Sequence, residues 1–197
     1  MSKQEIPPDF SALLPRGQIE RLVEQWLDDD MPSMMDVGGL VVGDAQREAN
    51  LWMKSPGVLA GKVFFDAVFR TLGCSVTWHD AAAREGVTIN ASGEHKVHLA
   101  TVTGPVNMIL RGERTALNAM SRCSGVATLS REAVDRVREL KWKGLVAGTR
   151  KTTPGFRIVE KLGLLIGGAA THRLDLSQVS LYSLFSFLPQ VQLKVAG

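Results

Sequence analysis

Cysteine is scarce in this sequence, and long apolar runs are absent from it. Cys74 and Cys123 are too few for a disulfide framework or a cysteine-based metal site, so we expect free thiols and a reducing compartment. No stretch approaches the roughly 20 apolar residues that cross a bilayer. The first residues also lack the apolar core of about 7–15 residues that is typical of signal peptides. These absences predict a cytoplasmic protein with no membrane partner.

A large surplus of charge of one sign is also missing. The 197 residues carry 23 Lys and Arg against 20 Asp and Glu, a net charge of +3. Such a small surplus permits an anionic ligand but does not predict a nucleic-acid partner. With 45% hydrophobic and 22% charged residues, the composition is that of a globular protein and excludes a disordered chain, a collagen repeat and a coiled coil. The length suits one domain, or one domain and part of a second.

Several common catalytic motifs do not occur. The chain has no Walker loop and no Gly-x-Gly-x-x-Gly after a strand, and Ser124 lacks the glycines that flank a hydrolase nucleophile. His79, His95 and His98 show no metal-ligand spacing with carboxylate partners, so we expect structural or surface roles for them.

The apolar pattern predicts helices combined with a small sheet, followed by strand–loop–helix units from about residue 140. Helical spacing marks the segments 19–27, 63–72, 104–120, 130–140 and 155–165. β-branched segments separated by turn residues predict strands at 74–79, 86–91 and 97–103. Residues 144–148 resemble a short buried strand, whereas residues 48–53 permit no assignment. A strand–loop–helix order is how a parallel α/β layer or barrel begins.

The most distinctive local feature is the basic segment 149–155, Thr-Arg-Lys-Thr-Thr-Pro-Gly. It follows a predicted strand and precedes a helix, at the edge where α/β proteins build their sites. Arg150, Lys151 and the helix start suit a carboxylate or phosphate, although a solvated basic turn explains the spacing equally well. His172-Arg173 follows the next Gly-Gly turn, where a second arginine can clamp a planar carboxylate. Taken alone, that pair and Glu113-Arg114 are more typical of exposed surface charge.

Five blocks of sequence, taken in order, carry more information than this spacing. They are Gly57-Val-Leu-Ala-Gly61, Gly112-Glu-Arg-Thr-Ala-Leu-Asn118, Arg122-Cys-Ser-Gly-Val-Ala127, Ala147-Gly-Thr-Arg-Lys-Thr-Thr-Pro-Gly-Phe-Arg157, and Glu160-Lys161 with Gly167-Gly-Ala169 and His172-Arg-Leu-Asp-Leu176. Together they resemble the animal-type quinolinate phosphoribosyltransferases, also called carboxylating nicotinate-nucleotide pyrophosphorylases, over about residues 10–176.

This resemblance implies a fold and a reaction. The fold class is α/β, with an α+β N-terminal sandwich domain at residues 1–121 and the first part of an incomplete α/β barrel at 122–176. The family joins quinolinate to phosphoribosyl pyrophosphate, which yields nicotinate mononucleotide, pyrophosphate and carbon dioxide for NAD synthesis, and it requires Mg²⁺.

The resemblance also assigns roles to individual residues. Arg150, Lys151, His172 and Arg173 would bind the two quinolinate carboxylates. Arg114 would reach into the site of a neighbouring subunit, which implies a homo-oligomer, either a dimer or a hexamer.

The chain departs from the family after Leu176. Where the family has a strand ending in a Lys-Asp-Asn-His block, residues 177–197 form a divergent tail, and the downstream groups that hold Mg²⁺ and the ribose phosphate are missing. Two hypotheses follow. Either the activity of the family applies, or this chain is a catalytically inactive truncated isoform that binds quinolinate weakly or assembles with full-length subunits. A related transferase acting on nicotinate is a third alternative, which the Thr-Arg-Lys-Thr block disfavours.

Overall fold

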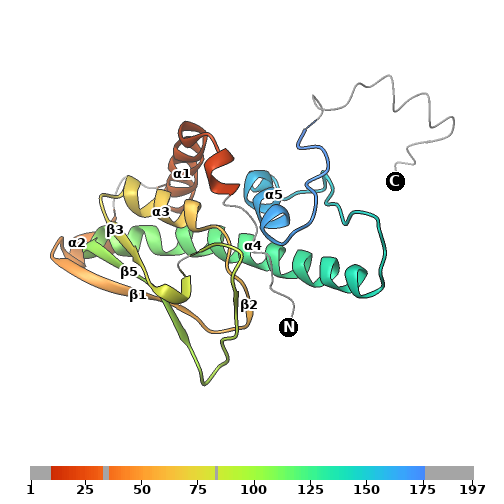
Figure 1. The fold of residues 1–197 in the computed structure, drawn as a ribbon. Coiled ribbons are helices and arrows are strands. Elements are labelled where there is room, and N and C mark those ends of the chain that lie inside the picture. Colours follow the sequence, from red (N-terminus) through yellow and green to blue (C-terminus); the bar gives the residue numbers. More distant parts are fainter. Residues whose placement is uncertain (1–9, 33–35, 83, 176–197) are drawn as a thin grey trace, which may run out of the picture.

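A three-stranded antiparallel sheet and one long helix organise the part of the chain that the computed structural model describes, residues 10–32, 36–82 and 84–175. The sheet has the order β1-β5-β3, formed by β1 (Gln46–Met53), β5 (Val97–Pro105) and β3 (Ser75–Trp78). Helix α4 (Val106–Glu139) continues directly from β5 and extends beyond the sheet, as Figure 1 shows. The predicted tail at 177–197 lies outside the described residues.

The central strand β5 buries one of its faces. Ala100, Val102 and Gly104 are buried, whereas Thr101 and Thr103 between them are partly exposed. This alternation is expected of an antiparallel sheet with one face against the core. Strand β3 pairs with β5 from Ser75↔Thr103 to Trp78↔Ala100, and β1 pairs with its other side. The strands predicted at 74–79 and 97–103 are therefore confirmed, and β1 accounts for the unassigned residues 48–53.

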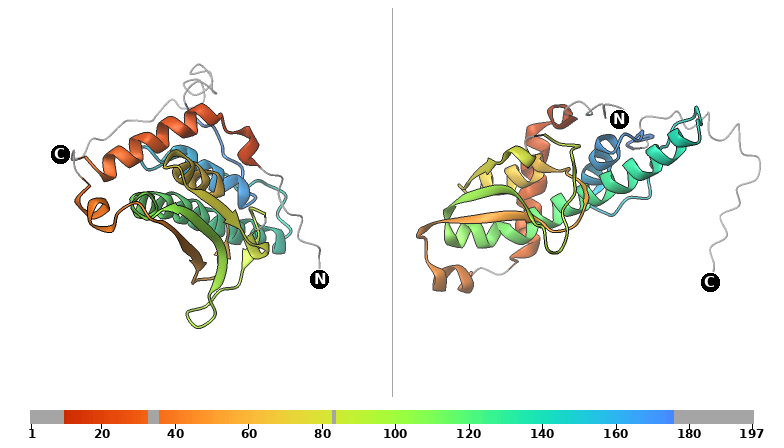
Figure 2. Two further views of the ribbon diagram at one scale, coloured as in Figure 1. Left: turned by 90° about the vertical axis from the view of Figure 1, so that its left-hand side faces the viewer. Right: turned by 60° about the horizontal axis from the view of Figure 1, so that its bottom comes forward.

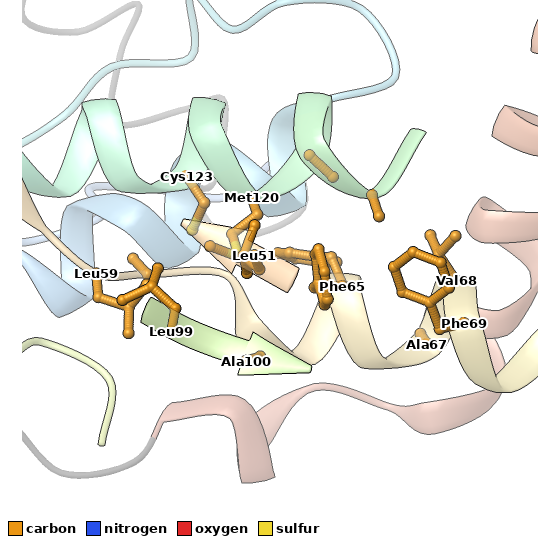
Figure 3. Packing of buried hydrophobic residues seen from close by; sticks show 14 of the residues in the cluster. Leu51, Leu59, Phe65, Ala67, Val68, Phe69, Leu99, Ala100, Met120 and Cys123 are labelled. Atoms are coloured by element: carbon orange, nitrogen blue, oxygen red, sulfur yellow. The ribbon is translucent and has the colours of Figure 1, made fainter. Parts of the chain in front are cut away.

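Helices cover the buried face of the sheet. Helix α1 (Arg16–Asp30) packs on α3 (Lys62–Thr71), which packs on α4. Phe64, Phe65 and Val68 of α3 are among the buried core residues, as Figure 3 shows for Phe65 and Val68. A Cβ at Gly112 of α4 would come within 3.2 Å of side chains of α3, so glycine permits this close approach. Apolar burial therefore holds this part of the chain together.

Apart from one further helix near the C-terminal end of the described chain, the remaining elements are short. They are η1 (Phe10–Leu13), α2 (Val37–Val42), η2 (Asp80–Ala82) and a two-stranded sheet of β2 (Gly57–Val58) and β4 (Thr88–Ile89).

The two helices predicted at 104–120 and 130–140 are one continuous helix, which corrects the sequence-based prediction. The polar residues between these two segments suggest a break in the helix. In the structure, their side chains form hydrogen bonds with the segment that crosses the helix. Ser124 Oγ donates to the Ala60 carbonyl at 2.8 Å and accepts from the Ala60 N–H at 3.0 Å. Thr128 Oγ1 accepts from the Val58 N–H at 2.9 Å. The helix also passes through the domain boundary predicted between residues 121 and 122, which stays a prediction.

The buried strand predicted at 144–148 is not one in this structure. Its Leu145 is 80% exposed, and within the described residues its strand-like contact is one parallel bridge between Ala147 and Ala170. A parallel strand is buried only when other elements cover both of its faces. Here Leu164 of α5 lies against Gly148, but residues 144, 145 and 147 remain exposed. The next helix, α5 (Arg157–Ile166), confirms the helix predicted at 155–165 and packs on the second half of α4, as both views in Figure 2 show.

Candidate functional site

Two backbone hydrogen bonds bring the basic segments together beside α5. The Gly148 N–H donates to the Ala170 carbonyl at 2.8 Å, and the Ala170 N–H donates to the Val146 carbonyl at 2.8 Å. Because these two stretches run parallel, the residues that follow them emerge at the same edge. That edge carries the segments 149–151 and 171–173.

A cavity of about 430 Å³ lies at this edge. Its lining residues are Gly148, Thr149, Arg150, Lys151, His172 and Arg173. Four of the five site residues proposed from the sequence thus lie around one cavity. None of the six lining residues is acidic, so the cavity favours an anion.

The fifth residue, Arg114, lies elsewhere. It is an exposed residue of α4 and does not line the cavity. The described residues of this chain therefore do not bring Arg114 to the site, and its predicted role in the site of a neighbouring subunit stays a prediction.

The two arginines of the cavity present unused donors. The Nε atoms of Arg150 and Arg173 are both buried, and neither has a hydrogen-bond partner within the described parts of the chain. A buried N–H without an acceptor is unfavourable because its hydration is lost without replacement. An oxygen ligand placed between the two side chains would satisfy both donors, and a guanidinium suits a carboxylate in particular.

His172 has a strained backbone. Its φ of 55° lies in the left-handed region, which is uncommon for a residue with a β-carbon. Strained residues of this kind gather at ligand sites, where the surrounding structure holds them in place. This backbone conformation of His172 sets the direction in which the chain continues into Arg173.

Helix α5 contributes two polar side chains that hold the loops of the site. Glu160 accepts hydrogen bonds from the Thr153 hydroxyl at 2.8 Å and from the Thr153 N–H at 3.3 Å. Lys161 is only 2% exposed and donates from Nζ to the carbonyl of Thr149 at 2.8 Å and to the carbonyl of Thr171. Burial, followed by the nearby charges of Arg157 and Arg150, lowers the pKa of the Lys161 ammonium group.

No individual role is predicted for Glu160 or Lys161 from the sequence. Their spacing carries no signal for one, because a lysine on a helix is normally exposed. Both lie within the sequence blocks that the resemblance covers, which was the only available indication.

A larger cavity of about 900 Å³ lies between η1, the start of α1 and α5. Apolar side chains such as Leu14, Leu22 and Leu165 supply most of its lining, and Arg150 and Arg173 are not part of it. Despite its larger volume, this cavity is therefore not a better candidate for an anion site than the cavity at Arg150 and Arg173.

The described residues do not fit a protein-held metal ion. Within residues 10–32, 36–82 and 84–175, no group of three His, Cys, Asp or Glu side chains could hold one. His79 and His98 do lie together, with ring centroids 4.2 Å apart, but their ring nitrogens face Thr101 and a backbone carbonyl. The Mg²⁺ implied by the resemblance stays an expectation, because this ion is usually held by one or two carboxylates together with substrate phosphates. No helix in the described part of the chain is both long and apolar enough to span a membrane.

Comparison with known proteins gives a consistent result. Residues 35–124 match the sequence model of the quinolinate phosphoribosyltransferase N-terminal domain, and residues 126–183 match that of the C-terminal domain. The second match continues past residue 176, where the blocks quoted from the sequence end.

Curated relatives and solved structures carry related names. The chain is 49% identical to human nicotinate-nucleotide pyrophosphorylase (carboxylating) over 85% of its own length and 54% of that protein, and 47% identical to the rat protein over 86% and 54%. The nicotinate-nucleotide pyrophosphorylase of Francisella tularensis has a similar structure, with a TM-score of 0.72 at 28% identity, covering 83% of this chain and 55% of that one. NadC of Streptococcus pyogenes gives a TM-score of 0.73 at 28% identity over 83% and 57%.

The chain therefore spans about half the length of the curated relatives it matches. The fold expected from the resemblance, an α+β N-terminal domain followed by the start of an α/β barrel, agrees with these structural neighbours. Two matched domain models in the correct order, close relatives and similar structures all lead to the same conclusion: the chain belongs to the quinolinate phosphoribosyltransferase family.

Proposed function

We propose that the cavity at residues 148–151 and 172–173 binds the two carboxylates of quinolinate. The observation that carries the proposal is the pair of buried Nε donors, on Arg150 and Arg173, that have no acceptor within the described residues. Lys151 adds a third positive charge to a cavity with no acidic lining. Two adjacent carboxylates on one ring can each engage one of the two arginines, so that each guanidinium has a carboxylate of its own.

We further propose that the protein acts as a carboxylating nicotinate-nucleotide pyrophosphorylase, the activity for which its relatives are named. The quinolinate nitrogen forms a bond to the ribose carbon of phosphoribosyl pyrophosphate while the bond from that carbon to pyrophosphate breaks. The 2-carboxylate then leaves as carbon dioxide, and the electron pair left on the ring carbon takes up a proton to give nicotinate mononucleotide.

The residues of this chain would contribute to that reaction by binding and orientation. Clamped carboxylates hold the ring nitrogen toward the ribose carbon, and oriented donors lower the barrier without reorganising during the reaction. Mg²⁺ belongs to this proposal as the expected partner of phosphoribosyl pyrophosphate, although the described residues offer it no ligand set.

Assembly and location complete the proposal. The exposed Arg114 on α4 is free to reach a second copy of the chain, which supports a homo-oligomer in which subunits share their sites. Cys74 and Cys123 are both free thiols, which supports a location in the reducing cytoplasm.

Calorimetric titration of the purified chain with quinolinate tests the proposal. We expect Arg150→Met and Arg173→Met each to weaken binding by about 2–5 kcal/mol, because each removes a desolvated charged contact. Arg136→Met is the matched control, since Arg136 is an exposed arginine at the far end of α4 whose ion pair in the described part of the chain is with Glu139. Unchanged quinolinate affinity in both site variants would refute the assignment of the cavity.

A parallel assay of nicotinate mononucleotide formation, with phosphoribosyl pyrophosphate and Mg²⁺ present, separates binding from turnover. Turnover supports the full activity of the family. Quinolinate binding without turnover supports the alternative hypothesis of an inactive chain that retains the dicarboxylate pocket.

A further inference from the structure

Lys161 is the one lysine among the buried residues of the described chain, and it connects two segments that are distant in sequence. Its ammonium group donates to the carbonyl of Thr149 at 2.8 Å and to the carbonyl of Thr171. A buried ammonium is unfavourable unless acceptors replace its lost hydration. Two backbone carbonyls from two different loops provide that replacement here.

The positions of these carbonyls matter more than their number. The Thr149 carbonyl belongs to the peptide bond that leads into Arg150, and the Thr171 carbonyl belongs to the one that leads into His172. Holding a carbonyl fixes the plane of its peptide bond, because that bond is rigid. Lys161 therefore holds the start of both loops whose side chains line the cavity.

The backbone hydrogen bonds between the two segments lie before Thr149 and Thr171 in the chain. They therefore do not fix the two peptide planes that lead into Arg150 and His172. The parallel contact consists of a bridge at Ala147 and Ala170, with hydrogen bonds at Gly148 and Ala170. Beyond these residues, within the described part of the chain, the hydrogen bonds of Lys161 connect one loop to the other. A strand pair this short does not by itself fix the distance between the residues that follow it.

We propose that Lys161 is a positioning residue that sets the separation of Arg150 and Arg173, and thereby selects ligands with two adjacent carboxylates over ligands with one. This inference rests on the proposed function and deepens it. A dicarboxylate needs both arginines at a fixed spacing, whereas a monocarboxylate needs only one of them. Lys161 acts through the loops, since it does not line the cavity.

The lowered pKa of Lys161 is consistent with this geometry. After burial, its causes are the positive charges of Arg157 and Arg150, so the lysine lies close to the cations of this region. An apolar side chain at this position would avoid that repulsion and the cost of burying a charge. A lysine here is therefore better explained by its bonds to the two loops than by helix packing alone.

The experiment compares Lys161→Met with Arg131→Met in the full chain. Arg131 is the matched control because it also donates from a long cationic side chain to two carbonyls, those of Ile166 and Gly167, both at 3.1 Å. Those carbonyls lie at the C-terminal end of α5 and not in the peptide bonds that lead into Arg150 and His172. Both variants remove a cation that holds the same helix, but only Lys161→Met releases the loops of the site.

The first readout is the affinity for quinolinate and for nicotinate, measured by calorimetry. In Lys161→Met we expect quinolinate affinity to fall about tenfold or more, because small displacements of clamping groups are costly. Nicotinate affinity should change less than about threefold, since a single arginine suffices for one carboxylate. Arg131→Met should leave the ratio of the two affinities unchanged. Equal losses for both ligands in Lys161→Met would overturn the proposal.

The second readout needs no ligand. Hydrogen exchange should become faster in Lys161→Met at the amides of Gly148, Lys151, Thr152 and Ala170, all of which are hydrogen-bonded in this structure, and not in Arg131→Met. Lys161→Gln keeps a hydrogen-bond donor without the charge, so its exchange rates at these amides should lie between those of Lys161→Met and Arg131→Met. Unchanged exchange at these amides in a folded Lys161→Met protein refutes the role of Lys161. Failure of the wild-type chain to bind quinolinate refutes the proposed function instead, and the exchange data still decide whether Lys161 holds the loops.

Discussion

The core and the loops of the site are held in place by different forces. From α1 to the middle of α4, large apolar side chains such as Phe64, Leu59 and Leu99 are almost completely buried in one cluster, which also includes Val159, Leu162 and Ile166 of α5. In the loop between α4 and α5, by contrast, Leu145 is 80% exposed and Trp142 is 54% exposed. Polar links from Lys161, Glu160 and Arg131 hold the loops of the site and the end of α5.

This difference has a physical consequence. Apolar burial is non-directional and tolerates small displacements, so it suits a scaffold. Hydrogen bonds from a buried ammonium to carbonyls are directional, so they suit loops whose side chains must be held in place. The scaffold, α5 included, is thus stabilised by its core, and the loops of the site are ordered by a few specific contacts.

The largest expected effect is in the scaffold. Phe64→Ala removes a fully buried ring that also meets Trp26 edge to face, with centroids 6.1 Å apart. We expect it to lower the free energy of unfolding by about 3–5 kcal/mol, through lost burial and the cavity left behind. Urea unfolding measures this as a lower midpoint at an unchanged slope. A loss below about 1 kcal/mol would contradict the view that this cluster carries the stability of the scaffold.

The contact between α4 and α5 should give an intermediate effect. A Cβ at Gly163 of α5 would lie 2.6 Å from the Cys123 carbonyl oxygen of α4. Gly163→Ala should therefore destabilise the protein by about 1–3 kcal/mol, because the two helices must move apart.

Gly125→Ala on the exposed side of α4 is the matched control for Gly163→Ala. A Cβ there meets nothing within 4 Å, so the higher helix propensity of alanine should stabilise the protein by up to about 1 kcal/mol. The same denaturation experiment on both variants should yield opposite signs. Equal signs would show that helix propensity, and not the close approach of α4 and α5, dominates at Gly163.

The smallest effect is expected in the loop between α4 and α5. Leu145→Ser replaces an apolar side chain that is mostly exposed, so the free energy of unfolding should change by less than about 0.5 kcal/mol. Thermal denaturation of the purified variant measures it. A clear loss of stability would mean that another element covers residues 144–148 in solution, and the contrast between the core and the loops of the site would no longer hold.

Much of the scaffold could be predicted from local pattern. The stripe of Ile19, Val23 and Leu27 marked α1, and the apolar spacing at 63–72 marked α3. Strand β1 escaped prediction because only half of its residues 46–53 are apolar and most of them are exposed at the edge of the sheet. The continuity of α4 escaped because Ser124 and Thr128 interrupt the apolar pattern, and here their hydroxyl groups bond to a segment more than 60 residues away.

The sequence by itself determined the family and the two basic segments, because these depend on residue identity and on local turn chemistry. Only the tertiary structure decided that Arg150 and Arg173 lie around one cavity, that Arg114 does not join them in this chain, and that Lys161 ties their loops together. The physical reason is the range of the contacts. Helix periodicity and turns act over a few residues, whereas the bonds of Lys161 reach residues 10 and 12 positions away, and nothing in their spacing marks the carbonyls that accept them.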